Sequence, residues 1–116
     1  MAANESSAGA GTRQINVAEV TYSNEHTNAG YTCSLSDLSR SIDGQLASGQ
    51  KNGYVFRLSG CTPTGSGAII KYQVVASPIT QNSTGTRVFC SDESNVIKVE
   101  QGGSPENCLA NGSPLQ

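Results

Sequence analysis

Four cysteines are the residues with the clearest chemical meaning in this chain. Cys33, Cys61, Cys90 and Cys108 lie 28, 29 and 18 residues apart, and no Cys-x-x-Cys pair occurs. Structural zinc sites usually bring their ligands in close pairs, and His26 is the only histidine available to complete such a set. An even number of widely spaced cysteines in a small polar chain instead predicts two disulfides and an oxidising compartment.

Nucleophilic and acid–base catalysis have few candidate residues. A catalytic triad would need His26, which lies at the end of a predicted helix, where a surface cation interacts favourably with the helix dipole. The stretch Gly65-Ser66-Gly67 lacks the full Gly-x-Ser-x-Gly elbow. The adjacent carboxylates Asp92 and Glu93 fall on a predicted hairpin turn, where neighbouring side chains point apart into water. We therefore expect neither an enzymatic activity nor a cofactor.

A phosphate-binding loop is also unsupported. Gly44 and Gly49 have the glycine spacing of such a loop, but the only nearby lysine, Lys51, does not directly follow the second glycine. We expect residues 43–53 to form a flexible loop rich in turn-forming residues.

The composition is that of one small domain with a thin core. Leu, Ile, Val and Phe contribute only 22 of the 116 residues, whereas Ser contributes 16, Gly 13, Thr 9 and Asn 9. The formal charge of −2 is too small for charge-driven disorder, and seven scattered basic residues form no stripe for nucleic acid. Apolar runs reach only three or four residues, far short of the roughly 20 that a membrane-spanning helix requires.

The hydrophobic periodicity predicts a single α+β domain over residues 1–116. Ile15, Ala18 and Tyr22 recur at helical spacing, which predicts an amphipathic helix over about residues 4–25. A loop region follows over 26–53, with a short helical turn at Leu35 and Leu38. Alternating patterns predict a β-meander over 54–100, with strands at 54–58, 69–76, 87–91 and 96–100, and a tail at 101–116 without periodicity. We expect the helix to pack on one face of a four-stranded antiparallel sheet.

Four cysteines allow three disulfide pairings. We favour Cys33–Cys61 with Cys90–Cys108, because the first bridge would tie the loop region to the end of the first strand. The second would anchor the unpatterned tail to the third strand. The interleaved pairing, Cys33–Cys90 with Cys61–Cys108, is the alternative if the first and third strands are neighbours.

Five segments carry a likeness to a known family. Residues 3–8 (ANESSA) and 13–22 (RQINVAEVTY) are similar to the stretch that follows the hydrophobic stem in a branch of bacterial pilin-like proteins. Residues 53–56 (GYVF), 72–74 (YQV) and 85–92 (GTRVFCSD) continue the likeness in order. The chain resembles the soluble headpiece of a type IV pilin or of a type II secretion pseudopilin.

The resemblance implies a structural subunit of an extracellular type IV pilus or pseudopilus, which works by assembly rather than by chemistry. It implies a hydrophobic stem that anchors the precursor in the bacterial inner membrane, with the headpiece in the periplasm, and later packs inside the filament. Residues 1–20 contain no signal peptide, so we expect the export signal and the stem to lie outside this sequence.

The implied partners are copies of the same chain or other pilin-like subunits, together with the pilus or secretion assembly machinery. No nucleic-acid partner is expected. The alternative function is a small secreted binding module, or an adhesive minor pilin, whose loops recognise a surface or a ligand.

The resemblance also bears on two local features. Many pilins carry a C-terminal disulfide loop, which favours the Cys90–Cys108 bridge. Secretion pseudopilins can hold calcium in a loop of their C-terminal half, and Asp92, Glu93 and Asn95 are the candidate ligands here, with Glu106 as a third carboxylate. Calcium takes six to eight oxygen ligands, so a plain hairpin turn with Asn95 in the left-handed conformation is the favoured interpretation.

Overall fold

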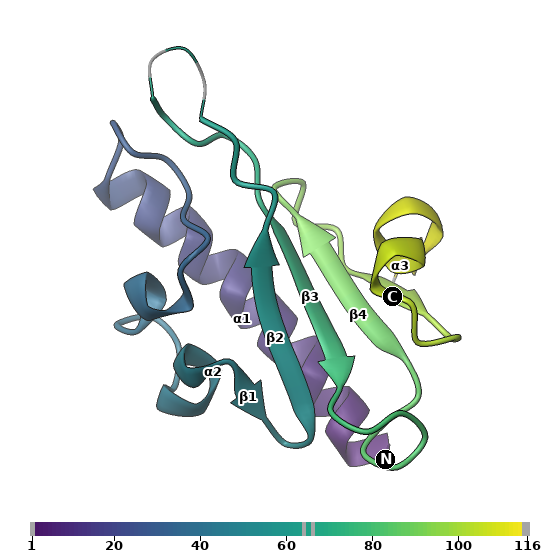
Figure 1. Cartoon of the computed structure of the whole chain (residues 1–116). Coiled ribbons are helices and arrows are strands. Elements are labelled where there is room, and N and C mark those ends of the chain that lie inside the picture. The colour runs from purple at the N-terminus through teal and green to yellow at the C-terminus, as the bar shows by residue number, and fades with distance from the viewer. Residues whose placement is uncertain (1, 64, 66, 115–116) are drawn as a thin grey trace.

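The fold is an α+β arrangement in which one long helix lies across an antiparallel sheet. A computed structural model describes residues 2–63, 65 and 67–114. Helix α1 (Ala2–Glu25) runs behind the central strands in Figure 1. The sheet has six strands in chain order, β1 (Gln50–Lys51), β2 (Tyr54–Ser59), β3 (Gln73–Pro78), β4 (Val88–Asp92), β5 (Lys98–Glu100) and β6 (Ser113–Pro114). Three short helical elements complete the described chain, namely η1 (Leu35–Leu38), α2 (Gly44–Ser48) and α3 (Pro105–Asn111).

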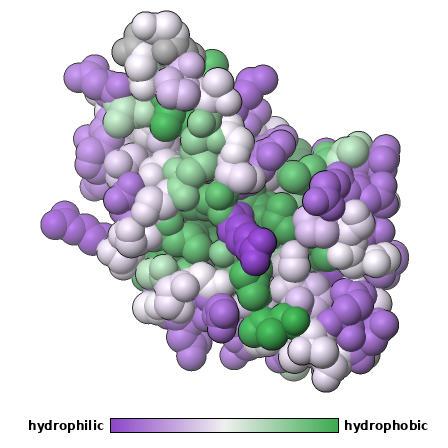
Figure 2. Space-filling model, viewed as in Figure 1, coloured by the Kyte–Doolittle hydropathy of each residue, from purple (hydrophilic) through white to green (hydrophobic). Residues whose placement is uncertain are grey.

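Alternation along the strands gives the sheet two apolar faces. One face carries Tyr54, Phe56, Val74, Ala76 and Phe89, which pack with the buried side of α1. On the other side, Val75, Val88 and Cys90 form a smaller cluster with Cys108 of α3. Figure 2 shows apolar side chains gathered over the middle of this second face, beside α3. Helix α1 therefore covers the central strands β2, β3 and β4 on one side, and the shorter α3 covers part of the other side over β3, β4 and β5.

Helix α1 approaches the sheet closely because a glycine faces β2. A Cβ at Gly11 would lie 2.9 Å from the Phe56 ring, which is closer than a real Cβ atom packs. The helix confirms the prediction at 4–25, but its buried side is not uniformly apolar. Ala8, Ile15 and Ala18 are buried there with three polar residues, Thr12, Asn16 and Glu19.

The prediction of four strands is wrong, because the structure adds a two-residue strand at each edge. Strand β1 falls in the predicted loop region and β6 in the predicted tail. Two residues are too few to show a period-two pattern, so only their pairing partners define them. The predicted second strand at 69–76 is shifted to Gln73–Pro78. Ile70, which alternation in the predicted strand would place on the same face as the buried Val74, is 56% exposed.

Two short helices also replace expected irregular segments. Helix α2 occupies part of the predicted loop at 43–53, where Asp43 caps it by accepting a hydrogen bond from the Leu46 nitrogen. Helix α3 lies in the predicted tail. The Ser104 side chain caps it by accepting a hydrogen bond from the Asn107 nitrogen, and proline occupies its first turn. A Ser-Pro-Glu signal for α3 was therefore present in the sequence, but a seven-residue helix gives little periodicity.

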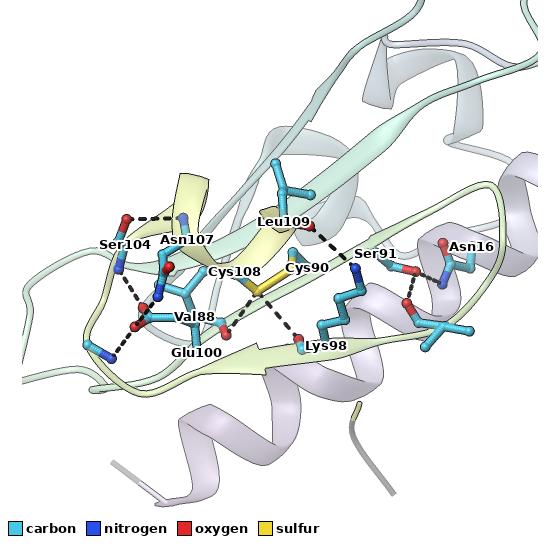
Figure 3. Close-up of a disulfide and its surroundings, with 12 residues drawn as sticks. Asn16, Val88, Cys90, Ser91, Lys98, Glu100, Ser104, Asn107, Cys108 and Leu109 are labelled. Carbon is cyan, nitrogen blue, oxygen red and sulfur yellow. Dashed lines mark hydrogen bonds between the residues drawn. A yellow bond between two sulfur atoms is a disulfide. The ribbon is translucent and has the colours of Figure 1, made fainter. Parts of the chain in front are cut away.

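The disulfides follow the favoured pairing. Cys33 is bonded to Cys61, which ties the segment after α1 to the chain beyond β2, with the two Cα atoms 6.0 Å apart. Cys90 of β4 is bonded to Cys108 of α3, with a Cα separation of 6.2 Å. The interleaved pairing is therefore not the one found. Figure 3 shows the second bridge beneath α3, where both cysteines are fully buried.

The carboxylate of Glu100 organises the turn that leads into α3. It accepts hydrogen bonds from the backbone nitrogens of Ser104 at 2.7 Å and Gly102 at 2.8 Å, and from the Asn107 amide at 3.3 Å (Figure 3). The Ser104 bond, followed by the Gly102 bond, lowers the pKa of Glu100. The tail is therefore a structured unit that a disulfide and a polar turn hold together.

Candidate interaction surface

A surface groove of about 560 Å³ lies between the outward side of α1 and the segment that enters β5. Three of its apolar side chains are open to solvent, with exposed fractions of 62% for Val17, 37% for Val20 and 44% for Val96. We refer to this feature as the α1 groove. The residues that line it are Arg13, Asn16, Val17, Val20, Thr21, Asn95, Val96 and Ile97.

A buried polar network fixes the two walls of the α1 groove to each other. The Asn16 amide of α1 donates to Ser91 Oγ of β4 at 2.9 Å, and Ser91 Oγ donates in turn to the Val96 carbonyl at 2.9 Å. The Tyr72 hydroxyl donates to Asn16 Oδ1 at 2.7 Å. Figure 3 shows Asn16 and Ser91 facing each other across the helix–sheet boundary. The groove is thus preformed, because a helix residue holds the opposite wall in place.

Arg13 supplies the charge of the α1 groove. Its side chain also borders two neighbouring hollows, one lined with Ala10, Gln14 and Val17 and one near Glu5. Among the residues that the structure describes, the ion pairs are Lys51–Asp43 and Arg87–Glu5, and neither includes Arg13. The guanidinium is therefore available to an anionic group of a partner that occupies the groove.

The candidate calcium ligands take part in the β4–β5 turn. Asp92 Oδ1 accepts from both the nitrogen, at 2.9 Å, and the hydroxyl of Ser94, at 2.6 Å. Glu93 Oε1 accepts from the Tyr72 nitrogen at 3.4 Å, and Asn95 has the expected left-handed conformation with a φ of 64°. Within 2–63, 65 and 67–114, no three His, Cys, Asp or Glu residues are grouped as a metal would need, and Glu106 lies apart on α3.

The other residues considered for catalysis are not brought together. His26 is exposed just beyond α1, where its ring stacks on Tyr22 and its Nδ1 lies 3.0 Å from the Tyr22 carbonyl oxygen. Ser66, between Gly65 and Gly67, lies outside the described residues. Gly44 and Gly49 begin and cap α2, so the phosphate-loop spacing belongs to a short helix.

Glu5 is a structural residue that sequence reasoning missed. Its Oε2 accepts from the backbone nitrogens of Thr86 at 2.9 Å and Arg87 at 3.1 Å, and its Oε1 accepts from Arg87 Nε at 3.2 Å. Burial acts to raise the pKa of Glu5, but the hydrogen bonds from Thr86 and Arg87 outweigh it and lower that pKa. The carboxylate thereby holds the first turns of α1 at the start of β4.

Glu19 has the opposite environment. It is fully buried on the inner side of α1, and its Oε1 accepts from the Thr32 nitrogen at 2.9 Å. Its Oε2 has no hydrogen-bond partner and is the one such buried side-chain atom in the described part of the chain. Burial raises the pKa of Glu19 to about 7, and the charge of Asp37 contributes to the increase. The sequence signal was Glu19 itself, an acid between predicted core residues.

No protein-family model matches the chain, and no curated protein or solved structure matches it either. In the described residues, no helix combines the length and hydropathy needed to cross a membrane. The function is therefore inferred from the local chemistry. The α1 groove offers apolar contacts beside one free guanidinium, which suits the binding of a partner surface better than bond-making chemistry.

Proposed function

We propose that this protein is a structural subunit of an extracellular filament, a type IV pilus or a pseudopilus, and that the α1 groove is one of its contacts with a neighbouring subunit. The observation that carries the proposal is that α1 has one side buried in the domain and another side exposed to solvent. Asn16 and Glu19 lie on the side buried against the rest of the domain, whereas Val17 and Val20 stay exposed beside Val96. Apolar side chains exposed next to one another form a patch, which indicates an interaction site more specifically than apolar residues exposed singly.

The rigidity of the headpiece supports the same role. The Glu5–Arg87 pair and the Asn16–Ser91 bond hold α1 to the sheet, and the Cys90–Cys108 bridge holds the tail to it. The Cys33–Cys61 bridge ties the segment after α1 to the chain beyond β2. A subunit that transmits force along a filament must keep its contact surfaces in fixed relative positions. A contact between the groove of one copy and a different surface of the next is heterologous, and its repetition builds an open helical array when the rotation between copies does not close into a ring.

The α1 groove is too small to hold a filament together by itself. A stable interface buries roughly 800 Å² on each partner, far more than three exposed valines contribute. The resemblance to pilins accounts for the remainder, because it implies a hydrophobic stem that continues α1 and packs in the filament core. The headpiece groove would then set the register of neighbouring subunits rather than supply most of the buried area.

Electron microscopy of cells that carry the subunit as its gene encodes it tests this proposal. Antibodies against the domain should label filaments along their length. Val17→Asp places a charge in the groove and should reduce filament number at equal subunit abundance. Asn24→Asp introduces the same charge on the exposed end of α1, outside the groove, and should leave filament number unchanged.

The opposite result would identify the alternative function. If the antibody detects only free monomer in the medium and labels no filaments, the protein is not a filament subunit. A small secreted binding module is then the better description. If it labels filaments whose number Val17→Asp leaves unchanged, the α1 groove is not a subunit contact. Codons upstream of Met1 discriminate further, because a short basic leader followed by a continuous apolar stretch is typical of a pilin, whereas a conventional cleavable signal peptide is typical of a free secreted domain.

A further inference from the structure

One hydrogen bond connects α1 with the segment of residues 31–42. It runs from the Thr32 nitrogen to Glu19 Oε1 and measures 2.9 Å. Within the described residues, no other hydrogen bond joins α1 to this segment, which otherwise docks through apolar side chains and the Cys33–Cys61 bridge. Leu38 and Ile42 are buried in the core, and Tyr31 and Leu35 pack against it. The carboxyl of Glu19 therefore supplies the polar part of the junction between the helix and this segment.

The segment extends the contact through a second carboxylate. The Thr32 hydroxyl donates to Asp37 Oδ2 at 2.7 Å and accepts from the Ser34 nitrogen at 3.1 Å. Asp37 lies within η1, directly before the buried Leu38. Any displacement of Thr32 from Glu19 thus affects the whole turn that carries Leu38 into the core.

The groups that face Glu19 offer no compensating positive charge. Asp37 approaches from η1 with the same charge, and the Tyr72 hydroxyl approaches from the sheet side, already engaged with Asn16. Burial, and then the charge of Glu19, raises the pKa of Tyr72, so that phenol stays neutral. The ion pairs among the described residues lie elsewhere. The bond from the Thr32 nitrogen favours the ionised carboxylate and acts to lower the pKa of Glu19, but burial outweighs it. An ionised Glu19 would leave Oε2 buried without a donor, which is far costlier than leaving a neutral acid there.

We propose that Glu19 is a proton-controlled latch, which holds residues 31–42 against α1 while its carboxyl is neutral and releases them when it ionises. This inference goes beyond the filament proposal and does not depend on it. It assigns a regulatory role to a buried acid that neither the α1 groove nor the disulfides use.

The direction of the effect follows from proton linkage. In the docked state the pKa of Glu19 is about 7, whereas an opened segment would return it toward the ordinary 4.5. Docking is then strongest below about pH 4.5, weakens as the pH rises toward 7, and stays at its weakest above that value. The equilibrium constant for opening should rise by up to about tenfold per pH unit within this window.

Hydrogen exchange on the intact protein tests the latch, with protection factors compared at pH 5 and pH 8. In the native sequence, the amides of residues 31–42 should lose at least tenfold in protection at pH 8 relative to pH 5. Glu19→Gln keeps the shape of the side chain and the acceptor for Thr32 but cannot ionise. The protection of residues 31–42 in this variant should therefore be equal at pH 5 and pH 8. Glu25→Gln removes an exposed acid from the same helix and should retain the native loss.

A second measurement does not depend on any variant. The Thr32 amide resonance of the native protein should titrate with a midpoint near neutral pH, because its acceptor changes charge. A midpoint below pH 5 would overturn the proposal, since Glu19 would then be ionised throughout the neutral range. An equal loss of protection in Glu19→Gln and in the native protein would overturn it too.

Discussion

Glu5 accepts hydrogen bonds from both the backbone nitrogen and the guanidinium of Arg87, 82 residues further along the chain. The same guanidinium lies over the ring of Phe89, 5.2 Å from its centroid. One carboxylate in the first turns of α1 thus fixes the start of β4, and a second acid on the same helix, Glu19, binds the segment of residues 31–42 with the opposite charge requirement. Glu5 must be charged, whereas Glu19 is favoured when neutral.

Replacing Glu5 with Gln should lower the stability of the domain. The amide accepts weaker hydrogen bonds from Thr86 and Arg87 and leaves the partly buried guanidinium without its counter-ion. The expected loss is about 1–3 kcal/mol in the free energy of unfolding at neutral pH. Because the pKa of Glu5 is lowered in the folded state, this contribution exists above its ordinary pKa and disappears as the pH falls below it.

Urea unfolding of the native protein and Glu5→Gln at pH 7 and pH 3 measures that difference. The two proteins should differ clearly at pH 7, and the difference should be smaller at pH 3. Ser6→Ala, at the exposed neighbouring position, is the matched control. Its free energy of unfolding should stay near that of the native protein at both pH 7 and pH 3. Equal stability of the two proteins at pH 7 would show that the Glu5–Arg87 contact contributes nothing.

The contribution of Glu19 to stability should have the opposite pH dependence to that of Glu5, and replacing Glu19 with Gln should remove it. A folded-state pKa raised to about 7 means that the native carboxyl adds stability fully below about pH 4.5, and that this stability is lost as the pH rises through 7. In thermal unfolding measured from pH 4.5 to pH 8.5, the Tm of the native protein should therefore fall as the pH rises, and the Tm of Glu19→Gln should change less with pH. A variant curve that is parallel to the native one would contradict this assignment.

The Asn16 network should matter for stability and for the shape of the α1 groove. Asn16→Ala leaves the buried hydroxyls of Ser91 and Tyr72 without one partner each, and the expected cost is about 2–3 kcal/mol. Residues 95–97 should also exchange their amide hydrogens faster, because the Ser91 link to the Val96 carbonyl loses its support. Gln14→Ala, at an exposed site two residues earlier, should change neither quantity.

The C-terminal disulfide should be required for α3 to stay on the sheet. Removing it with the double change Cys90→Ser and Cys108→Ser opens an 18-residue link and should cost about 3 kcal/mol. Unfolding in guanidinium measures the loss in the free energy of unfolding. Faster amide hydrogen exchange confined to residues 101–114 would show that the loss arises from detachment of α3. Peptide mapping of the unreduced native protein checks the pairing itself, because a fragment that joins Cys33 to Cys90 or to Cys108 contradicts it.

The long elements of the fold could be predicted from the sequence because each carries its own pattern. Ile15 and Ala18 place the buried side of α1, and Tyr54 with Phe56 alternate along β2. The even number and wide spacing of the cysteines predicted two bridges, and the positions of the cysteines relative to these elements favoured the pairing found. Such signals survive because a helix of six turns or a strand of five or six residues repeats its periodicity several times.

Only the tertiary structure decided the edge strands, the second face of the sheet and the candidate site. Strands β1 and β6 exist because a neighbour offers them hydrogen-bonding groups, and two residues contain no period of their own. The α1 groove needs Val17 and Val96 side by side, although 79 residues separate them in the chain. Burial of Glu19 likewise depends on where Thr32 and Tyr72 come to lie. Contacts between distant segments are properties of packing, and a local hydrophobic pattern carries no information about which distant residue will complete them.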